Sequence, residues 1–385
     1  MVVVVGVSAP AYAGSAPAPI VVAGNGTAGS SGDGGPAAQS TLSAPLGAAV
    51  GPDGTLYIAD TGNHKVRAVK PDGSISTVAG SGKAGTTAPA VSSGAKATDV
   101  ALLTPVALAV GADGTLFIAD ATAARVYAVA ADGTLTVRAD AAGTASLSPP
   151  MGAPTGLAAG QDGAVYVGDQ ENNRVLAVSA DGKASVAAGN GVLTVSAAGG
   201  PATEVPVGAP NSLGASGDGD LWISGGLLLR RLHSQQIATV TQPQSGRWAT
   251  ADGAQWPPAD QPLNDVEAVS AGPSGPYVFD RKQKAVLRLG AGGVVTTVAS
   301  LSGADFGSLG TIHLAVGPAA DGPVYIVDTG RHRVLSVPVT GGSDAPGGSG
   351  ADSAPVWPWL AGGVVVLILL VLVIVLVARR RAGRS

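Results

Sequence analysis

One sequence unit recurs six times along the chain, and this repetition limits the possible folds more than any other feature. The first copy reads PLGAAVGPDGTLYIADTGNHKVRAVKPDGSISTVAG, and the second reads PVALAVGADGTLFIADATAARVYAVAADGTLTVRAD. The six copies cover Pro45–Gly80, Pro105–Asp140, Pro154–Gly189, Pro210–Gln242, Val266–Ser300 and Thr311–Val339. Such self-similarity predicts a repeat architecture in which one supersecondary unit is used in every copy.

Each copy contains four short apolar runs separated by turn residues. The runs of the first copy are Leu46–Val50, Leu56–Ala59, Val66–Val69 and Ile75–Ala79. Asp-Gly between such runs favours a hairpin, because Gly adopts positive φ and the Asp side chain bonds the turn backbone. The 58 Gly and 27 Pro of the chain fit many short strands joined by turns. Four antiparallel strands per copy, repeated around an axis, form a β-propeller.

The two ends of the repeat region complement each other. The sixth copy lacks a fourth strand, because the chain leaves the pattern after Arg333–Val339. The missing strand is found ahead of the first copy, where Ile20–Ala23 and the following Gly-Asn-Gly match Ser76–Ala79 and its Gly-Ser-Gly exit. Pairing of Ile20–Ala23 with Arg333–Val337 would close the ring and remove an exposed sheet edge. We therefore predict an all-β, six-bladed propeller over residues 20–340, closed by an N-terminal strand.

The copies resemble NHL repeats. The motif that names this family appears here as Asn63-His64-Lys65-Val66, and looser versions are Asn173-Arg174-Val175 and Arg331-His332-Arg333-Val334. The resemblance covers about Ile20–Val339 and implies the propeller fold. It does not imply one function, since the family includes binding scaffolds, sensor domains of membrane receptors, RNA binders and a lyase.

The C-terminal region predicts a membrane span. Leu360–Ala378 reads LAGGVVVLILLVLVIVLVA without a charged residue, and a helix of 19 residues is about 28 Å long, close to a hydrocarbon core. Trp357 and Trp359 precede this segment, and Arg379, Arg380 and Arg381 follow it, as expected for interfacial aromatic residues and a cytoplasmic basic cluster. We predict a transmembrane helix over residues 357–378 and a basic cytoplasmic tail over residues 379–385.

The remaining segments fit export. Residues 1–13 read MVVVVGVSAPAYA, an apolar run followed by a small-x-small cleavage pattern, and we expect a signal peptide truncated at its start. Residues 341–355 read GGSDAPGGSGADSAP and predict a flexible linker. The expected location is the cell membrane, crossed once, with the propeller outside and the C-terminus in the cytoplasm.

Charge and cysteine content exclude some functions. The part before the predicted span holds 18 basic and 26 acidic residues, a net charge of −8, which opposes binding to nucleic-acid phosphates. The chain has no Cys, which excludes disulfides and thiolate metal sites.

Five aspartates recur at the end of the second strand of a copy. They are Asp60, Asp120, Asp169, Asp280 and Asp328, with Ser224-Gly225 in the fourth copy. A carboxylate before a turn, repeated in each well-formed copy, is typical of a turn cap rather than of a catalytic group. We therefore assign no catalytic residue.

Positions that break the repeat are more informative for function. Aligned by their distance to the next turn, the second positions of the innermost strands are Leu46, Val106, Thr155, Asn211, Glu267 and Ile312, and the third position of the sixth copy is His313. Thr155, Asn211, Glu267 and His313 are thus predicted near one mouth of the central channel. Such a set suits Ca²⁺ or another divalent cation, or a polar ligand. The alternative is a water-filled channel with a polar lining and no cofactor.

A second candidate is the long segment between the fourth and fifth copies. It contains Trp248 and Trp256, which form either a contact surface or a local core packed on the ring.

These features favour a non-catalytic binding scaffold at the cell surface, whose partner is a protein, peptide or glycan and not a nucleic acid. The alternative function is a metal-dependent lactonase- or lyase-like enzyme that uses Asn211, Glu267 and His313 at the channel mouth.

Overall fold

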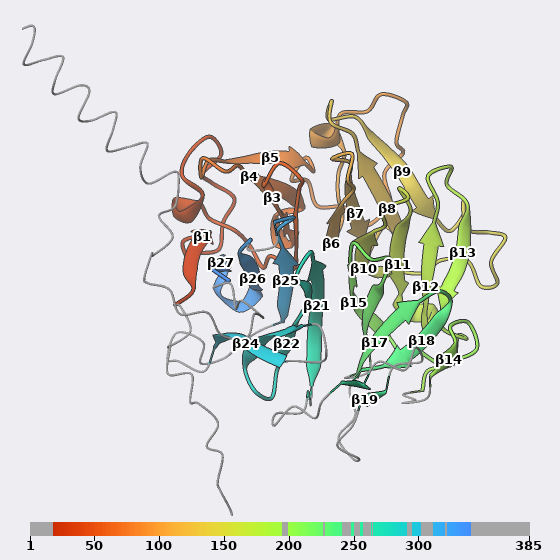
Figure 1. Ribbon diagram of the computed structural model, residues 1–385. Helices are drawn as coiled ribbons and strands as arrows, with labels where there is room; N and C mark the ends of the chain where they lie inside the picture. The colour runs from red at the N-terminus through yellow and green to blue at the C-terminus, as the bar shows by residue number, and fades with distance from the viewer. Residues whose placement is uncertain are drawn as a thin grey trace, which may run out of the picture. The chain divides into compact units, whose positions relative to one another are not determined.

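A computed structural model describes residues 18–194, 199–225, 228–240, 263, 265–290, 295–301, 311–319 and 322–339, and the backbone of residues 248–249 and 255–256. These residues form six antiparallel sheets arranged around an axis, as predicted, and each sheet is one blade (Figure 1). The element bounds differ from the predicted runs by at most one residue in the first blade.

The first three blades follow the chain in order. Blade one contains β2 (Gly47–Val50), β3 (Leu56–Asp60), β4 (Lys65–Val69) and β5 (Ile75–Ala79). Blade two contains β6 (Pro105–Val110), β7 (Leu116–Asp120), β8 (Arg125–Val129) and β9 (Leu135–Asp140). Blade three contains β10 (Pro154–Ala159), β11 (Val165–Asp169), β12 (Arg174–Val178) and β13 (Ala184–Ala188).

The last three blades complete the ring. Blade four contains β15 (Pro210–Ala215), β16 (Leu221–Gly225), β17 (Leu228–His233) and β18 (Gln236–Thr239), with β14 (Gly200–Pro201) added outside β18. Blade five contains β21 (Val266–Gly272), β22 (Gly275–Asp280), β23 (Ala285–Leu289) and β24 (Val295–Ser300). Blade six contains β25 (Ile312–Val316), β26 (Val324–Asp328), β27 (Arg333–Val337) and β1 (Ile20–Ala23).

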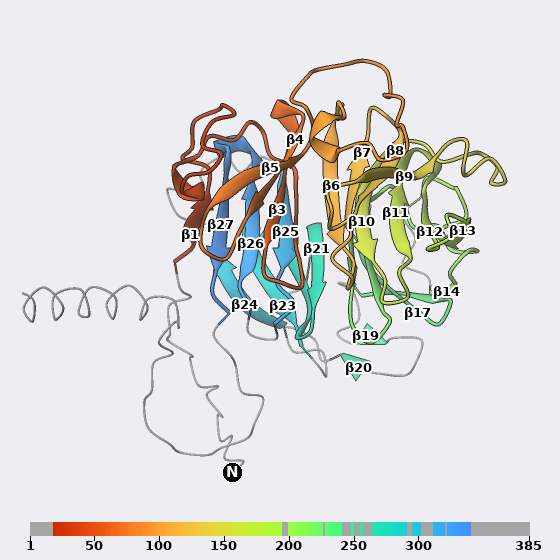
Figure 2. The same cartoon turned by 90° about the horizontal axis from the view of Figure 1, so that it is seen from above.

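The N-terminal strand closes the ring. Ile20 pairs with Ser336, Val21 with Leu335 and Ala23 with Val334, which confirms the predicted pairing (Figure 2, where β1 and β27 lie side by side). The innermost strands β2, β6, β10, β15, β21 and β25 each contact the next one, and β25 contacts β2. The ring is therefore continuous through an antiparallel ladder made from the two ends of the repeat region.

The hydrophobic core lies between blades rather than in one central mass. One cluster joins Ala59 and Val66 of blade one to Ile118 and Leu135 of blade two, and each of the other clusters likewise joins neighbouring blades. The innermost strands are rich in Gly and Ala, which lets them approach closely. A Cβ on Gly47 would lie 2.6 Å from the Val106 carbonyl oxygen of blade two. Small residues near the axis and larger ones farther out give each blade a wedge shape.

The NHL motif forms a short turn between the second and third strands. The 3₁₀ helices among the described residues are η1 (Ala37–Gln39), η2 (Thr61–Asn63), η3 (Ala97–Asp99), η4 (Gln170–Asn172) and η7 (Thr329–Arg331). The residue after η2, η4 and η7 has a left-handed backbone, at His64, Asn173 and His332. The imidazole Nδ1 of His64 lies 2.6 Å from the Leu103 carbonyl oxygen, so the motif links one blade to the segment that enters the next.

Several predictions from the sequence fall outside the described residues. These are the signal peptide over residues 1–13, the linker over 341–355, the span over 357–378 with Trp357 and Trp359, and the tail with Arg379, Arg380 and Arg381. Among the residues that the structure describes, no helix is both long and apolar enough to cross a membrane.

The closing strand gives a test of the fold. Ala23 is fully buried in β1, whereas Ile20 of the same strand is 62% exposed. We expect Ala23→Asp to lower the free energy of unfolding by at least about 3 kcal/mol, because it buries an unpaired carboxylate. The matched change Ile20→Asp should cost no more than about 0.5 kcal/mol. Urea unfolding of both variants measures this difference, and equal losses would contradict closure by β1.

Candidate functional site

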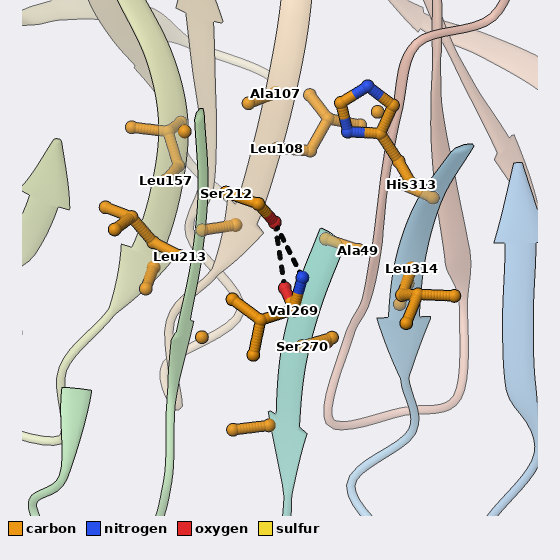
Figure 3. A pocket seen from close by; sticks show the side chains of 18 of the residues that line it. Ala49, Ala107, Leu108, Leu157, Ser212, Leu213, Val269, Ser270, His313 and Leu314 are labelled. Carbon is orange, nitrogen blue, oxygen red and sulfur yellow. Dashed lines mark hydrogen bonds between the residues drawn. The ribbon is translucent and has the colours of Figure 1, made fainter. Parts of the chain in front are cut away.

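A cavity of about 140 Å³ lies at the axis, between the innermost strands of all six blades (Figure 3). Most of its lining consists of Gly, Ala, Leu and Val. The polar side chains among the lining residues are those of Thr155, Asn211, Ser212, Ser270 and His313. The structure thus brings three of the four predicted mouth residues to one cavity, and Glu267 is not part of this lining.

A β-bulge in the innermost strand sets the direction of the side chain at the second position of that strand. In blade two Pro105 pairs with Asp120 and Ala107 with Ala119, so Val106 is the extra residue of the bulge. Asn211 and Glu267 occupy the same place in blades four and five, and Thr155 lies in the irregular stretch of blade three. A bulge redirects a side chain out of the regular alternation of the strand. These side chains therefore turn toward the neighbouring blade.

Three hydrogen bonds follow one another around this part of the ring. The Thr155 hydroxyl of blade three donates to the Pro210 carbonyl oxygen of blade four over 2.7 Å. The Asn211 amide of blade four donates to the Glu267 carbonyl oxygen of blade five over 3.3 Å. The Glu267 carboxylate then accepts from the Ile312 backbone N–H of blade six over 3.2 Å. Thr155, Asn211 and Glu267 thus connect consecutive blades.

The Glu267 carboxylate is also paired with an arginine. Its Oε2 lies 3.1 Å from Nε of Arg281, and the carboxylate is mostly buried while Arg281 is largely exposed. Burial raises the pKa of Glu267, and the Ile312 N–H and Arg281 oppose this shift. The Glu267 carboxylate therefore already accepts a hydrogen bond from one backbone N–H and forms an ion pair with one arginine.

His313 reaches the cavity from a strand without a bulge. Ile312 pairs with Asp328, just as Pro105 of blade two pairs with Asp120. Ile312 therefore occupies the first position of its innermost strand, and the sequence alignment that placed it at the second position is wrong by one residue. Blade six has no bulge residue. His313 was nevertheless aligned correctly with the third positions of the other strands, because it pairs with Val327, the residue before Asp328. Figure 3 shows the imidazole projecting from β25. Burial lowers the pKa of His313 to about 4, so the ring is neutral at neutral pH.

The chemistry open to this cavity is limited. The imidazole makes no hydrogen bond within the described residues, and the buried Oδ1 of Asn211 has no hydrogen-bond partner there. Both atoms could accept a hydrogen bond from water or from a small polar ligand. No group of three or more His, Asp or Glu among the described residues is placed to hold a metal ion. A water-filled channel without a cofactor stays a prediction, and a divalent cation at the mouth stays the alternative to it.

The predicted turn cap is wrong for Asp60, Asp169 and Asp328, whose side chains do not cap the 3₁₀ turn that follows, and the repeated aspartates bind neighbouring segments instead. All are fully buried. Asp120 accepts backbone N–H groups from Leu103 over 2.6 Å, Thr104 over 2.9 Å and Ala123 over 3.1 Å. Asp60 similarly accepts from Ser43, and Asp169 from Gly152. Each of these three carboxylates therefore fixes the segment that enters its blade.

Sequence reasoning missed a second set of links between blades. The hydroxyls of Thr61, Ser224 and Thr329 each donate to a carbonyl oxygen of the next blade, at Pro105, Val266 and Pro45. The sequence signal for these links was a Ser or Thr directly before or after the aligned aspartate position. Two fully buried arginines, Arg67 and Arg230, were also missed. Arg67 forms a 2.7 Å ion pair with Asp33 and so anchors the segment that enters blade one.

The two tryptophans of the predicted contact segment lie opposite each other in a small hairpin. β19 (Trp248–Ala249) and β20 (Gln255–Trp256) pair antiparallel, and Trp248 is the partner of Trp256 (Figure 2). Their side chains are outside the described part of the structure, so a contact surface here stays a prediction.

Comparisons with known proteins support the fold. Residues 42–68 match the sequence profile of the NHL repeat, which confirms the resemblance noted for the first copy. A search of the curated proteins found no match. Similar solved structures include a gluconolactonase from Xanthomonas campestris, at 13% identity and a TM-score of 0.51, covering 78% of this chain and 87% of that one.

Two further structures are less similar. Virginiamycin B lyase from Staphylococcus aureus has 13% identity and a TM-score of 0.47, covering 77% of this chain and 95% of that one. A nidogen/laminin complex has 16% identity and a TM-score of 0.44, covering 64% of this chain and 75% of that one. At 13% identity the similarity to the gluconolactonase shows the fold alone.

The environment of His313 predicts a pH effect. Between pH 6.5 and about 4 the unfolded chain takes up a proton at this position and the folded chain does not, so folding stability falls as the pH falls through this range. We expect the stability of the native protein relative to His313→Asn to decrease from pH 7 to pH 4.5. Urea unfolding at several pH values measures this, with the difference at pH 7.5 as the baseline. Parallel pH profiles would contradict a buried neutral imidazole.

Proposed function

We propose that this six-bladed β-propeller, which carries an NHL repeat, is a non-catalytic scaffold that binds a protein, peptide or glycan at the cell surface. One observation carries the proposal: the polar residues of the channel mouth are used between blades. Thr155, Asn211 and Glu267 bond the next blade, and Glu267 also pairs with Arg281.

The size of the axial cavity supports the same function. Its volume of about 140 Å³ is below the roughly 300–1,000 Å³ of pockets that enclose small ligands. A substrate larger than this volume would need the innermost strands to separate, and these strands are held by the hydrogen bonds just described. Recognition of a larger partner by the loops and blade edges needs no such change.

The hairpin turns add charge to the surface. The backbone N–H and the hydroxyl of Thr55 lower the pKa of Asp53, and those of Thr115 do the same for Asp113. The Asp53 and Asp113 carboxylates therefore add negative charge to these two turns. An acidic surface disfavours nucleic acid, in line with the charge balance of the sequence.

Display outside the cell is part of the proposal. It rests on the apolar segment over 360–378, on Trp357 and Trp359 before it and on the three arginines after it. The linker over 341–355 would hold the propeller near the membrane.

The alternative is a metal-dependent lactonase- or lyase-like enzyme at the channel mouth. The neutral His313 and the unpartnered Oδ1 of Asn211 favour it, because both are free acceptors at one cavity. Glu267 would have to leave Arg281 to join them as a ligand.

Labelling of single cysteines tests the display. The chain has no Cys, so Ser93→Cys on an exposed segment and Ser385→Cys at the C-terminus each introduce one thiol. We expect a membrane-impermeant maleimide to label Ser93→Cys on intact cells and Ser385→Cys only after permeabilisation. Labelling of Ser385→Cys on intact cells, or failure to label Ser93→Cys there, would contradict the proposed topology.

A further inference from the structure

The outer edges of several blades are covered by the segment that enters the same blade. In blade one Ile75 of β5 donates its N–H to the Gly35 carbonyl oxygen over 3.0 Å and accepts from the Gly34 N–H over 2.7 Å. Pro36 and Ser74 form an antiparallel bridge beside this pair. An extended piece of the entering segment thus acts as a fifth strand.

Blades two and four repeat this arrangement. In blade two Leu135 of β9 donates to Ala95 over 2.8 Å. In blade four the covering piece is β14, where Gly200 pairs with Ile237 of β18. The covering sequences are Gly-Gly-Pro-Ala at 34–37 and 199–202 and Gly-Ala-Lys-Ala at 94–97, and their last alanine is buried each time. The shared sequence explains why these segments lie flat on the edge.

Blade three lacks this cover in the described part of the chain. Its entering segment, 141–153, reads AAGTASLSPPMGA and has no such tetrapeptide. It bonds instead at the NHL turn, where Pro150 accepts from Asn172 and Pro149 accepts from Arg174. It makes no backbone hydrogen bond to β13. Figures 1 and 2 show β13 at the rim of the ring, with β14 of blade four beside it.

The hydrogen-bond pattern identifies the open groups of this edge. The Ser179 N–H donates to the Lys183 carbonyl oxygen, so these two residues form a hydrogen-bonded pair of the ladder. Because such pairs alternate along antiparallel strands, the backbone N–H and C=O groups of Ala184 and Val186 point away from β12. Ala184 corresponds to Ile75 and Leu135, whose outward groups are paired in blades one and two. Within the described residues the N–H and C=O groups of Ala184 and Val186 have no partner on the outer side. This edge can accept one more strand.

A groove of about 460 Å³ lies next to this edge, between blades three and four. Tyr166, Leu221 and Leu232 contribute apolar surface to it, and the polar, uncharged side chains of Thr203, Ser234, Gln235 and Gln236 line it as well. Ser185, Val186 and Ala187 of β13 form one side. None of the described residues that line the groove carries a charge. A strand laid on β13 would direct alternate side chains into this space.

We propose that β13 is a docking edge for an extended, uncharged segment of another protein, which adds a strand to blade three and places a bulky uncharged side chain in the groove. This inference rests on the proposed scaffold function and assigns it a site and a partner chemistry. Backbone hydrogen bonds to Ala184 and Val186 would supply affinity, and the groove would supply specificity.

A second copy of this chain fits the site less well. Pairing of β13 with β13 of another copy would satisfy the edge. The side chains of β13 are Ala184, Ser185, Val186, Ala187 and Ala188, which are too small to fill the neighbouring groove. The groove therefore favours a different polypeptide with a larger uncharged residue.

The test uses a phage-displayed library of random 12-residue peptides, selected against the purified full chain. A selected peptide is then measured against two proline variants. Val186→Pro removes an outward N–H of β13 without removing a bond to β12. Val137→Pro is the matched control, because Val137 occupies the same position on β9 of blade two. We expect Val186→Pro to weaken binding about tenfold or more and Val137→Pro to change it less than about twofold.

Ser185→Lys, with Thr136→Lys as its control, gives a second comparison that leaves the backbone intact, since Ser185 and Thr136 are both exposed. The added charge at the groove should weaken binding, and the control should not. Peptide binding should also slow amide exchange at Ala184 and Val186.

Three results would overturn the proposal. Selected peptides that bind Val186→Pro and Ser185→Lys as tightly as the native chain would place binding elsewhere and leave the scaffold function standing. Failure to select any peptide would remove the docking edge, while the labelling result on cells would be unaffected. A dimer that Val186→Pro dissociates, seen by analytical ultracentrifugation, would assign the edge to a second copy.

Discussion

Buried backbone N–H groups at the point where the chain enters a blade must find acceptors, and a buried carboxylate provides them. Asp120 alone accepts three such groups, from Leu103, Thr104 and Ala123. Unpaired donors in a dry interior each cost about 1–3 kcal/mol, so the aspartate recurs wherever the same turn is built. Hydroxyl and imidazole bonds between blades then fix each blade against the next. The apolar clusters between blades can pack tightly only because these polar contacts hold the blades in register.

Much of this arrangement was predictable from the sequence. The repeat gave four strands per blade, and the match of Ile20–Ala23 to a fourth strand gave the closure. The regularity of the repeated aspartates indicated a structural role, although not the segments that they bind. These predictions succeed because alternation, turn chemistry and repetition are local or periodic signals.

The candidate site was predicted less well. Thr155, Asn211 and His313 do line one cavity, but Glu267 turns to Arg281 and Ile312 instead. The direction of the Thr155, Asn211 and Glu267 side chains depends on a register shift in the innermost strands of blades three to five, and blade six has none. A bulge changes the register by one residue without a distinct sequence signal, so alignment by distance to the turn could not detect it. The hydroxyl links between blades depend on the same three-dimensional register.

Differences between blades, rather than their shared residues, point to function. The shared polar residues serve the ring, whereas blade three alone among the first four has an uncovered edge in the described structure. A missing Gly-Gly-Pro-Ala segment and a neighbouring uncharged groove both occur at this blade. A scaffold can gain a binding edge in this way without disturbing the contacts that close the ring.

The central claim is that the polar residues at the axis join blades and hold no ion. Elemental analysis of the purified full chain, together with its melting temperature in calcium before and after chelation, tests this claim most directly. The account predicts no stoichiometric metal and no shift of the melting temperature with calcium. A tightly held ion that is lost in Glu267→Ala would contradict it and would favour the metal-dependent enzyme.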